Sequence, residues 1–380
     1  MSPATKLTGR EFYERLGCPK KIVAPMVDQS ELTRLGGFYR DAMEGKCALR
    51  LCSMRAYSAR KGSREKNIVG KSGPLKETQF CANDPKDFLA AAKIVEGDCD
   101  AVDLNLGCPQ GIARKGRYGS FLQDDWELIS TLISTAHKNL LIPVTTKIRV
   151  FPDREKTLQY AKMILDAGAA FLSVHGRTRE QKGQFCGIAD WEIIRFLKER
   201  LGEHVVVFAN GNILHSEDVQ ECLKKTQADG VMSAEANLSN PAIFVSSERK
   251  EDRYPRVDSM ARAYLDILTE LDDPGSMSGI KAHLFHLLRP AFSQTMNIDL
   301  RNRLGKTPGR EISLYYGIID ILSQRIDEVL KDSEVWDEEE KDEMGYLKIP
   351  WWRCQSYVRP LRERPRKGED MLPDKKVKVM

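Results

Sequence analysis

The segment DLNLGCPQG, residues 103–111, sets an aspartate, an asparagine and a cysteine around a Gly-Cys-Pro bend. The Cys108 thiol could donate a proton, and the Asn105 amide could pair with the polar edge of a ring. The loop gives Cys108 no neighbouring His or acid that would make it a thiolate nucleophile. On this segment alone, Cys108 is either a proton donor or a small residue packed at a turn.

Other residues suited to binding a ligand stand within or just after short apolar runs. They are Pro25, Met26, Gln79, Lys147, Arg149, His175, Arg177, Asn210, Gly211 and Asn212. A buried polar group without a partner costs roughly 1–3 kcal/mol. The recurrence of such groups therefore predicts a polar ligand that several of them share.

The residue types narrow the chemistry of that ligand. Lys147 supplies positive charge, and Gln79 and Asn210 supply donors and acceptors that suit a flat heterocycle. The turns ANGNI (209–213) and SAEANLSNP (233–241) expose backbone N–H groups of the kind that bind phosphate in barrel proteins. FMN fits this pattern, and so do pyridoxal phosphate and a phosphorylated substrate.

Short apolar runs that predict strands recur through the first 240 residues. They lie at 21–25, 47–53, 78–82, 101–107, 143–150, 171–176, 205–211 and 229–234. Helical patterns alternate with them at 84–95, 125–138, 156–168, 190–202 and 216–226. This alternation predicts a closed (β/α)8 TIM barrel, which would gather the residues named above where the strands end. An open doubly wound sheet is the alternative, although no glycine-rich fingerprint follows the first strand.

The second part of the chain is predicted to be helical. We expect an α/β TIM barrel at 1–248, a smaller all-helical domain at 249–332, and a charged, flexible extension at 333–380. Residues 331–343 carry eight acids and two lysines, whereas 353–380 carry nine Lys or Arg and four acids. Such blocks are typical of solvated termini, and the basic tail is alternatively a contact for a polyanion.

Composition limits the class of protein. The chain has 380 residues, is 41% hydrophobic and carries a net charge of +4. No apolar stretch approaches the roughly 20 residues that span a membrane. Its nine cysteines form neither a Cys-x-x-Cys pair nor a zinc-like cluster with His. We expect a monomeric, reduced protein of the cytoplasm or nucleus, without a membrane or metal partner.

Taken together, these segments resemble the tRNA-dihydrouridine synthases, flavoenzymes that reduce a uracil in tRNA. DLNLGCPQGIARKGRYGSFL (103–122) matches the family's Asn-x-Gly-Cys-Pro signature with its later Gly-Ser, and APM, VHGRT and ANGNI fall in the family's order. The resemblance spans roughly residues 20–330. LNLGCPQ, KIRVFPD, TREQKG and MSAEANLSNP are similar to the eukaryotic branch that modifies positions 16 and 17 of the tRNA D-loop.

The resemblance implies a role for each candidate residue. Cys108 would donate a proton to the uracil, and NADPH or NADH would supply the reducing equivalents. FMN would be held by Pro25, Met26, Val27, Gln79, Lys147, His175, Asn210, Gly211, Asn212, Ala234 and Glu235. The tRNA substrate would be bound by Asn105, Arg149, Arg177, Arg114 and Arg117. Further RNA contacts would come from the helical domain, through Lys281, His283, His286, Arg289, Arg301, Arg303, Lys306 and Arg310.

The chain departs from the family at one point. Many members carry Gly-Arg after the eighth strand, where this chain has Ala234 and Glu235. Because a glutamate cannot supply the arginine's charge, the phosphate of FMN would depend on backbone N–H groups or on another cation, such as Lys147 or Arg177. Two other functions stay open: an FMN barrel that acts on a free pyrimidine, as dihydroorotate dehydrogenase does, and a non-catalytic RNA-binding protein.

Overall fold

The structure is a computed structural model. It describes residues 6–7, 9–26, 49–52, 75–269, 277–308, 311–332, 336, 340–342 and 345–359. Val27, Arg310, most of the acidic block and the end of the basic tail lie outside the described residues.

Eight parallel strands close into a barrel, each paired with its neighbour in chain order. They are β1 (Lys21–Val23), β2 (Leu49–Cys52), β3 (Leu75–Phe80), β4 (Ala101–Leu106), β5 (Val144–Arg149), β6 (Ala169–His175), β7 (Val207–Asn210) and β8 (Gly230–Ser233). The first and last strands pair through Ile22 and Met232, which closes the sheet. The predicted α/β barrel is therefore confirmed, and the open sheet is excluded.

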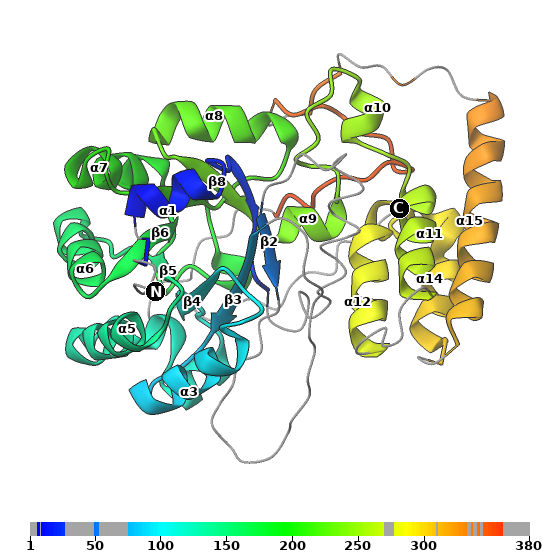
Figure 1. Ribbon diagram of the computed structural model, residues 1–380. Coiled ribbons are helices and arrows are strands. Elements are labelled where there is room, and N and C mark those ends of the chain that lie inside the picture. The colour runs from blue at the N-terminus through cyan, green and yellow to red at the C-terminus, as the bar shows by residue number, and fades with distance from the viewer. Residues whose placement is uncertain are drawn as a thin grey trace, which may run out of the picture.

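Helices follow the strands. They are α3 (Pro85–Val95), α4 (Gly111–Gly116), α5 (Trp126–Asn139), α6 (Arg154–Asp166), α7 (Trp191–Leu201) and α8 (Ser216–Thr226), with the short 3-10 turns η1 (Gly119–Leu122) and η2 (Gly183–Phe185). The longer helices, α3, α5, α6, α7 and α8, cover the outside of the barrel (Figure 1). Asp84, Asp125, Asp153 and Asp190 precede four of these helices, and their side chains accept hydrogen bonds from the first turn. These aspartates fix where the helices begin.

The third strand differs from its predicted position. The sequence pattern predicted residues 78–82, whereas β3 is Leu75–Phe80. Glu77 makes the start of this strand look polar, yet its side chain is only 1% exposed. It lies within hydrogen-bond distance of Thr145 inside the barrel. The pattern therefore missed the start of the strand, because an acidic residue usually indicates an exposed position.

One end of the barrel is closed by the N-terminal helix α1 (Gly9–Arg15). Phe12 stacks on Phe171 with ring centroids 6.1 Å apart, and Tyr13 meets Phe208 edge to face at 5.9 Å. Both helix residues are almost fully buried. The site must therefore lie at the other end, where the strands finish, as is usual for such barrels.

The remaining helices continue the chain beyond the barrel. They are α9 (Glu235–Ser239), α10 (Lys250–Arg253), α11 (Val257–Thr269), α12 (Met277–Leu287), α13 (Arg289–Phe292), η3 (Thr295–Asn297), α14 (Ile298–Lys306) and α15 (Ile312–Asp332). Helices α11, α12, α14 and α15 stand together at one side of the barrel, with α9 between them and the strands (Figure 1). The domain boundaries at 248 and 332 stay a prediction. No helix in the described part of the chain is long and apolar enough to cross a membrane.

Residues 345–359, the C-terminal segment, differ from the expected flexible extension. Cys354 is fully buried, and its backbone N–H donates to the Pro255 carbonyl at 2.8 Å. The Tyr346 ring stacks on His215 at 4.1 Å. The segment returns toward α9 and the barrel (Figure 1) because its aromatic run, which includes Trp351 and Trp352, packs against the core.

Candidate active site

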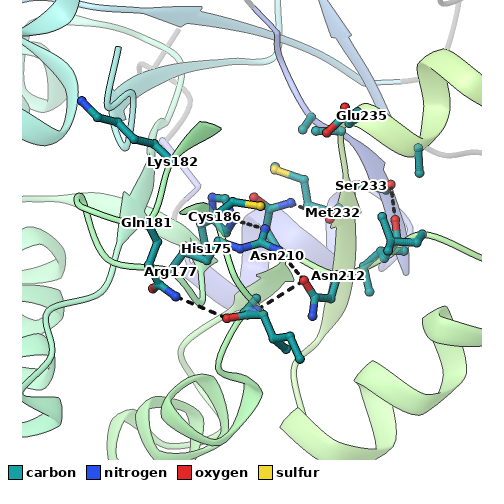
Figure 2. A pocket seen from close by; sticks show the side chains of 18 of the residues that line it. His175, Arg177, Gln181, Lys182, Cys186, Asn210, Asn212, Met232, Ser233 and Glu235 are labelled. Atoms are coloured by element: carbon teal, nitrogen blue, oxygen red, sulfur yellow. Dashed lines mark hydrogen bonds between the residues drawn. The ribbon is translucent and has the colours of Figure 1, made fainter. Parts of the chain in front are cut away.

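A cavity of about 1380 Å³ opens at the ends of the strands. Most of the predicted site residues line it, namely Pro25, Met26, Asn105, Cys108, Lys147, Arg149, His175, Arg177, Asn210, Gly211, Asn212, Ala234 and Glu235. Figure 2 shows part of this wall, with Lys182 at one end of the view and Ser233 and Glu235 at the other. Residues from six strands and their loops thus converge on one space.

Three predicted site residues with described positions do not line the cavity. Gln79 lies behind Asn105 and is only 1% exposed. Arg114 and Arg117 are exposed on and just after α4, the helix that begins at the cavity wall with Gly111. Gln79 is therefore linked to the cavity only indirectly, by its hydrogen bond with Asn105, and the two arginines lie outside the cavity.

The loop that carries Cys108 is held from two sides. The Asn105 side-chain oxygen accepts hydrogen bonds from the N–H groups of Gly107 and Cys108, each at 2.9 Å. The Cys108 carbonyl accepts from the Ser120 hydroxyl at 2.9 Å and from its N–H at 3.1 Å. Gly119 has φ +63, and a Cβ on it would lie 2.8 Å from the Cys108 carbonyl oxygen. The Gly-Ser pair after the Cys-Pro bend thus has a structural reason: it allows close approach to the thiol loop.

A chain of buried polar groups supports Asn105 from inside the barrel. Asn105 donates to Gln79 at 2.7 Å, and Gln79 donates to Asp103 at 2.5 Å. Thr145 donates to Asp103 at 2.8 Å and also contacts Glu77. One hydroxyl proton cannot serve two carboxylates. Burial and the nearby Asp103 raise the pKa of Glu77 well above its ordinary value. Of the two acids, Glu77 is therefore the protonated one.

Asp103 and Lys147 form the charged part of this region. Burial raises the pKa of Asp103 to about 6, although Gln79, Thr145 and Lys147 oppose the shift. Burial and Arg149 lower the pKa of Lys147 to about 8, while Asp103 acts in the other direction. At neutral pH both groups are charged, so Lys147 keeps a positive charge at the cavity wall. The sequence analysis assigns no ligand-binding role to Asp103, and it misses Glu77 because only its burial reveals it.

His175 is the neutral member of the site. Burial, with Lys147, Arg149 and Arg177 nearby, lowers its pKa well below the ordinary value. Its Nε2 lies 3.1 Å from the Arg177 guanidinium, which can only donate, so we assign the ring proton to Nδ1. Arg177 also bonds to Asn212, and this group is visible in Figure 2.

The arginines of the cavity wall are engaged with the backbone. Arg149 donates to the carbonyls of Gly107 at 2.8 Å, Thr178 at 2.7 Å and Gln181 at 2.9 Å. Arg177 donates to the Gly187 carbonyl at 2.9 Å. Arg149 therefore joins the loops after β4 and β6, and Arg177 joins the loop after β6 to Asn212 in the loop after β7. The sequence alone did not reveal this structural role.

The wall after β8 contains an ion pair between distant parts of the chain. Glu235 bonds to Arg359 of the C-terminal segment, and both line the cavity. Sequence reasoning missed Arg359 because the basic tail appeared solvated.

The predicted RNA contacts in the helical region differ in their exposure to solvent. Arg301, Arg303 and Lys306 are exposed on α14. His283 is only 7% exposed and packs against Tyr264, so its prediction as an RNA contact is wrong. His286 lines the cavity. Arg289 stacks on Tyr357 with 3.2 Å between guanidinium carbon and ring centroid.

Comparisons with known proteins agree on one family. Residues 22–303 match the family model described as dihydrouridine synthase. A Schizosaccharomyces pombe protein is 48% identical over 94% of this chain and 92% of its own length, and a Saccharomyces cerevisiae protein is 45% identical over 94% and 87%. A Rattus norvegicus protein is 41% identical over 93% of this chain and 78% of its own length. The two yeast proteins are named as tRNA-dihydrouridine(16/17) synthases of the NAD(P)(+) type, and the rat protein as one that is like them.

Proposed function

The chain belongs to the dihydrouridine synthase family, and from that membership we propose that it reduces uridine to 5,6-dihydrouridine in tRNA. The similar yeast proteins support positions 16 and 17 of the D-loop as the target. The proposed cofactor is FMN, with NADPH or NADH as reductant. The observation that carries the proposal is the shared cavity, which brings Cys108 and Asn105 to the same space as Lys147 and His175.

The chemistry of the donors fits FMN. Lys147 offers positive charge, Asn210 an amide, and His175 a neutral imidazole, which suit a flavin ring. The residues proposed to hold it are Pro25, Met26, Lys147, His175, Asn210, Gly211, Asn212, Ala234 and Glu235, the last through its backbone N–H and not its carboxylate. Gln79 is proposed to act indirectly, because its side chain is occupied by Asn105 and Asp103. When bound, FMN supplies hydride chemistry for carbon 6 of the uracil.

Cys108 is proposed to supply the proton for carbon 5. A thiol can donate a proton, and the loop contacts described above hold the backbone of Cys108 at the cavity wall. Asn105 is proposed to meet the uracil edge while its oxygen maintains the thiol loop. Since a stacked base cannot enter a cavity, the target uridine must leave the tRNA stack.

The tRNA is proposed to extend across α4 and the helical region. Arg114 and Arg117 are exposed beside the cavity entrance, and Arg301, Arg303 and Lys306 are exposed on α14. These cations would neutralise RNA phosphates, which favours binding at low salt. The barrel at 1–248 would thus perform the chemistry, and the helical domain at 249–332 would bind tRNA.

The test combines the purified protein with cellular tRNA. We expect the protein to be yellow, with flavin absorbance that bleaches when NADPH is added without oxygen. In cells that lack the protein, positions 16 and 17 should lose dihydrouridine, and re-expression of wild type, but not Cys108→Ala, should restore it. A colourless protein that FMN cannot reconstitute, or unchanged modification in those cells, would refute the proposal.

A further inference from the structure

The cavity wall after β7 and β8 is completed by a third part of the chain. Tyr357, Val358 and Arg359 line the cavity together with Ser233 and Glu235. The Ser356 hydroxyl donates to the Leu214 carbonyl in the loop after β7. Arg359 pairs with Glu235, the first residue of α9, which follows β8. The segment therefore crosses the two loops at which barrels of this type commonly bind phosphate.

The position of Arg359 is set by the segment rather than by Glu235. The side chains of the pair are 38% and 37% exposed, and such partly exposed ion pairs contribute little stability. The firmer attachments are the buried Cys354, the Ser356 hydrogen bond and the stacking of Arg289 on Tyr357. The guanidinium can thus exchange its carboxylate partner for another anion at low cost.

Four other cations of the cavity wall are bonded to other groups of the protein. Arg149 donates to three backbone carbonyls, and Arg177 donates to Gly187 and Asn212. Lys182 donates to the Pro109 carbonyl at 3.0 Å, and Lys225 pairs with Glu221 on α8 at 2.6 Å. Lys147 lies on β5, on another strand than the residues that follow β8. Among the described residues, Arg359 is the cation that forms an ion pair with Glu235, the first residue of the helix after β8.

We propose that Arg359 binds the phosphate of FMN, so that the C-terminal segment completes the cofactor site. The proposal rests on the function proposed above. A phosphate monoester carries nearly two negative charges at pH 7, and an isolated Glu235 carboxylate would repel it. Arg359 offsets that carboxylate and offers a planar fork of donors that matches phosphate oxygens. Arg359, which is 124 residues from Glu235 in sequence, thus provides positive charge beside this acidic residue.

The test compares FMN with riboflavin, which lacks the phosphate. Apoprotein is titrated with each flavin, and the change in flavin fluorescence gives both dissociation constants. In Arg359→Gln we expect FMN binding to weaken about tenfold to hundredfold, as for loss of a charged hydrogen-bond pair, with riboflavin binding unchanged. In Glu235→Gln we expect FMN to bind as tightly as in wild type or more tightly, because the competing carboxylate is gone.

Two further variants test whether the loss of FMN affinity comes from the missing positive charge or from a disturbed fold. Arg195→Gln is the matched control, because Arg195 also pairs with a glutamate, at 2.8 Å, but lies exposed on α7. It should leave both affinities unchanged. Moving the arginine with the double change Glu235→Arg and Arg359→Gln should restore much of the preference for FMN.

The outcomes are separable. If wild type prefers FMN over riboflavin and Arg359→Gln keeps that preference, the inference is overturned. If Arg359→Gln weakens tRNA binding while FMN affinity is unchanged, the arginine serves the RNA and the inference is again overturned. If wild type binds neither flavin, the proposed function itself fails.

Discussion

The backbone N–H of Cys108 donates a 2.9 Å hydrogen bond to the side-chain oxygen of Asn105. The same oxygen accepts from Gly107, while the Asn105 amide group donates to Gln79. Asn105 therefore joins the thiol loop to the buried polar chain that ends at Glu77. A residue that resemblance assigned to the substrate also determines the shape of the proposed proton-donor loop.

Substitution of Asn105 should separate these two roles. Asn105→Ala leaves the N–H groups of Gly107 and Cys108 without their acceptor, so we expect a loss of roughly 1–3 kcal/mol in the free energy of unfolding, together with reduced turnover. Asn105→Asp keeps an acceptor for the loop but loses the donor to Gln79. It should keep more of the stability and still lose activity. Urea unfolding and single-turnover assays measure the two effects, and equal stability of the alanine variant and wild type would contradict the loop role.

Cys108→Ala should retain flavin and lose dihydrouridine formation. General acid catalysis contributes roughly 10²- to 10⁴-fold, so the rate of uridine reduction should fall within that range. Reduction of the flavin by NADPH does not require the thiol and should continue at the wild-type rate. Stopped-flow absorbance follows the flavin, and nucleoside analysis follows the product. Cys99→Ala, which changes a thiol bonded to Val95 outside the cavity, is the control. Full product formation by Cys108→Ala would remove the proton-donor role.

Gly119→Ala should displace the thiol loop without touching its chemistry. The new Cβ would lie 2.8 Å from the Cys108 carbonyl oxygen, at a backbone φ of +63 that disfavours side chains. We expect a loss of about 1–3 kcal/mol in stability and a fall of up to about 100-fold in turnover. Gly97→Ala is the matched control, since a Cβ there meets nothing within 4 Å. Wild-type turnover in Gly119→Ala would show that the loop tolerates the shift.

Some of this arrangement could be read from the sequence, and some could not. The eight strands are recognisable because buried parallel strands are continuously apolar, and β4 is buried at all six positions. Cys108, Lys147 and His175 were recognisable because polar groups at the ends of apolar strands are costly to bury without a partner, which indicates a ligand. Glu77 was not, because a lone acid looks exposed until its partners Asp103 and Thr145 are seen. The contact between Arg359 and Glu235 joins residues far apart in sequence, and no local pattern encodes it.

Asp103→Asn should change how stability depends on pH. Burial raises the pKa of Asp103 to about 6, from an ordinary value of 3.8, so between about pH 4 and 6 the folded protein keeps a proton that the unfolded chain releases. The contribution of this group to the free energy of unfolding therefore falls as the pH rises through that window, by on the order of 2–3 kcal/mol in all.

The asparagine variant lacks this ionisation. Relative to wild type, its free energy of unfolding should thus improve from pH 4 to pH 6, even if its absolute stability is lower through altered hydrogen bonds with Gln79 and Thr145. Urea unfolding at pH 4, 5, 6 and 7 measures the difference. A difference that is constant across these values would mean that Asp103 does not hold a raised pKa in the folded protein.

The exposed arginines beside the cavity should affect tRNA affinity through salt. Arg114 and Arg117 flank the end of α4, and each phosphate contact contributes about 0.7–0.9 to the slope of log affinity against log salt. The double variant Arg114→Gln and Arg117→Gln should therefore bind tRNA more weakly at low salt and reduce the slope by about 1.5. The double variant Arg195→Gln and Arg200→Gln on α7 removes the same charge from exposed positions that do not line the cavity, and it should keep the wild-type slope. Filter binding between 50 and 300 mM salt, roughly the range in which phosphate contacts dominate, distinguishes the two. Equal slopes for both variants would mean that α4 does not meet the RNA backbone, so the tRNA would have to approach the cavity from the side of α14.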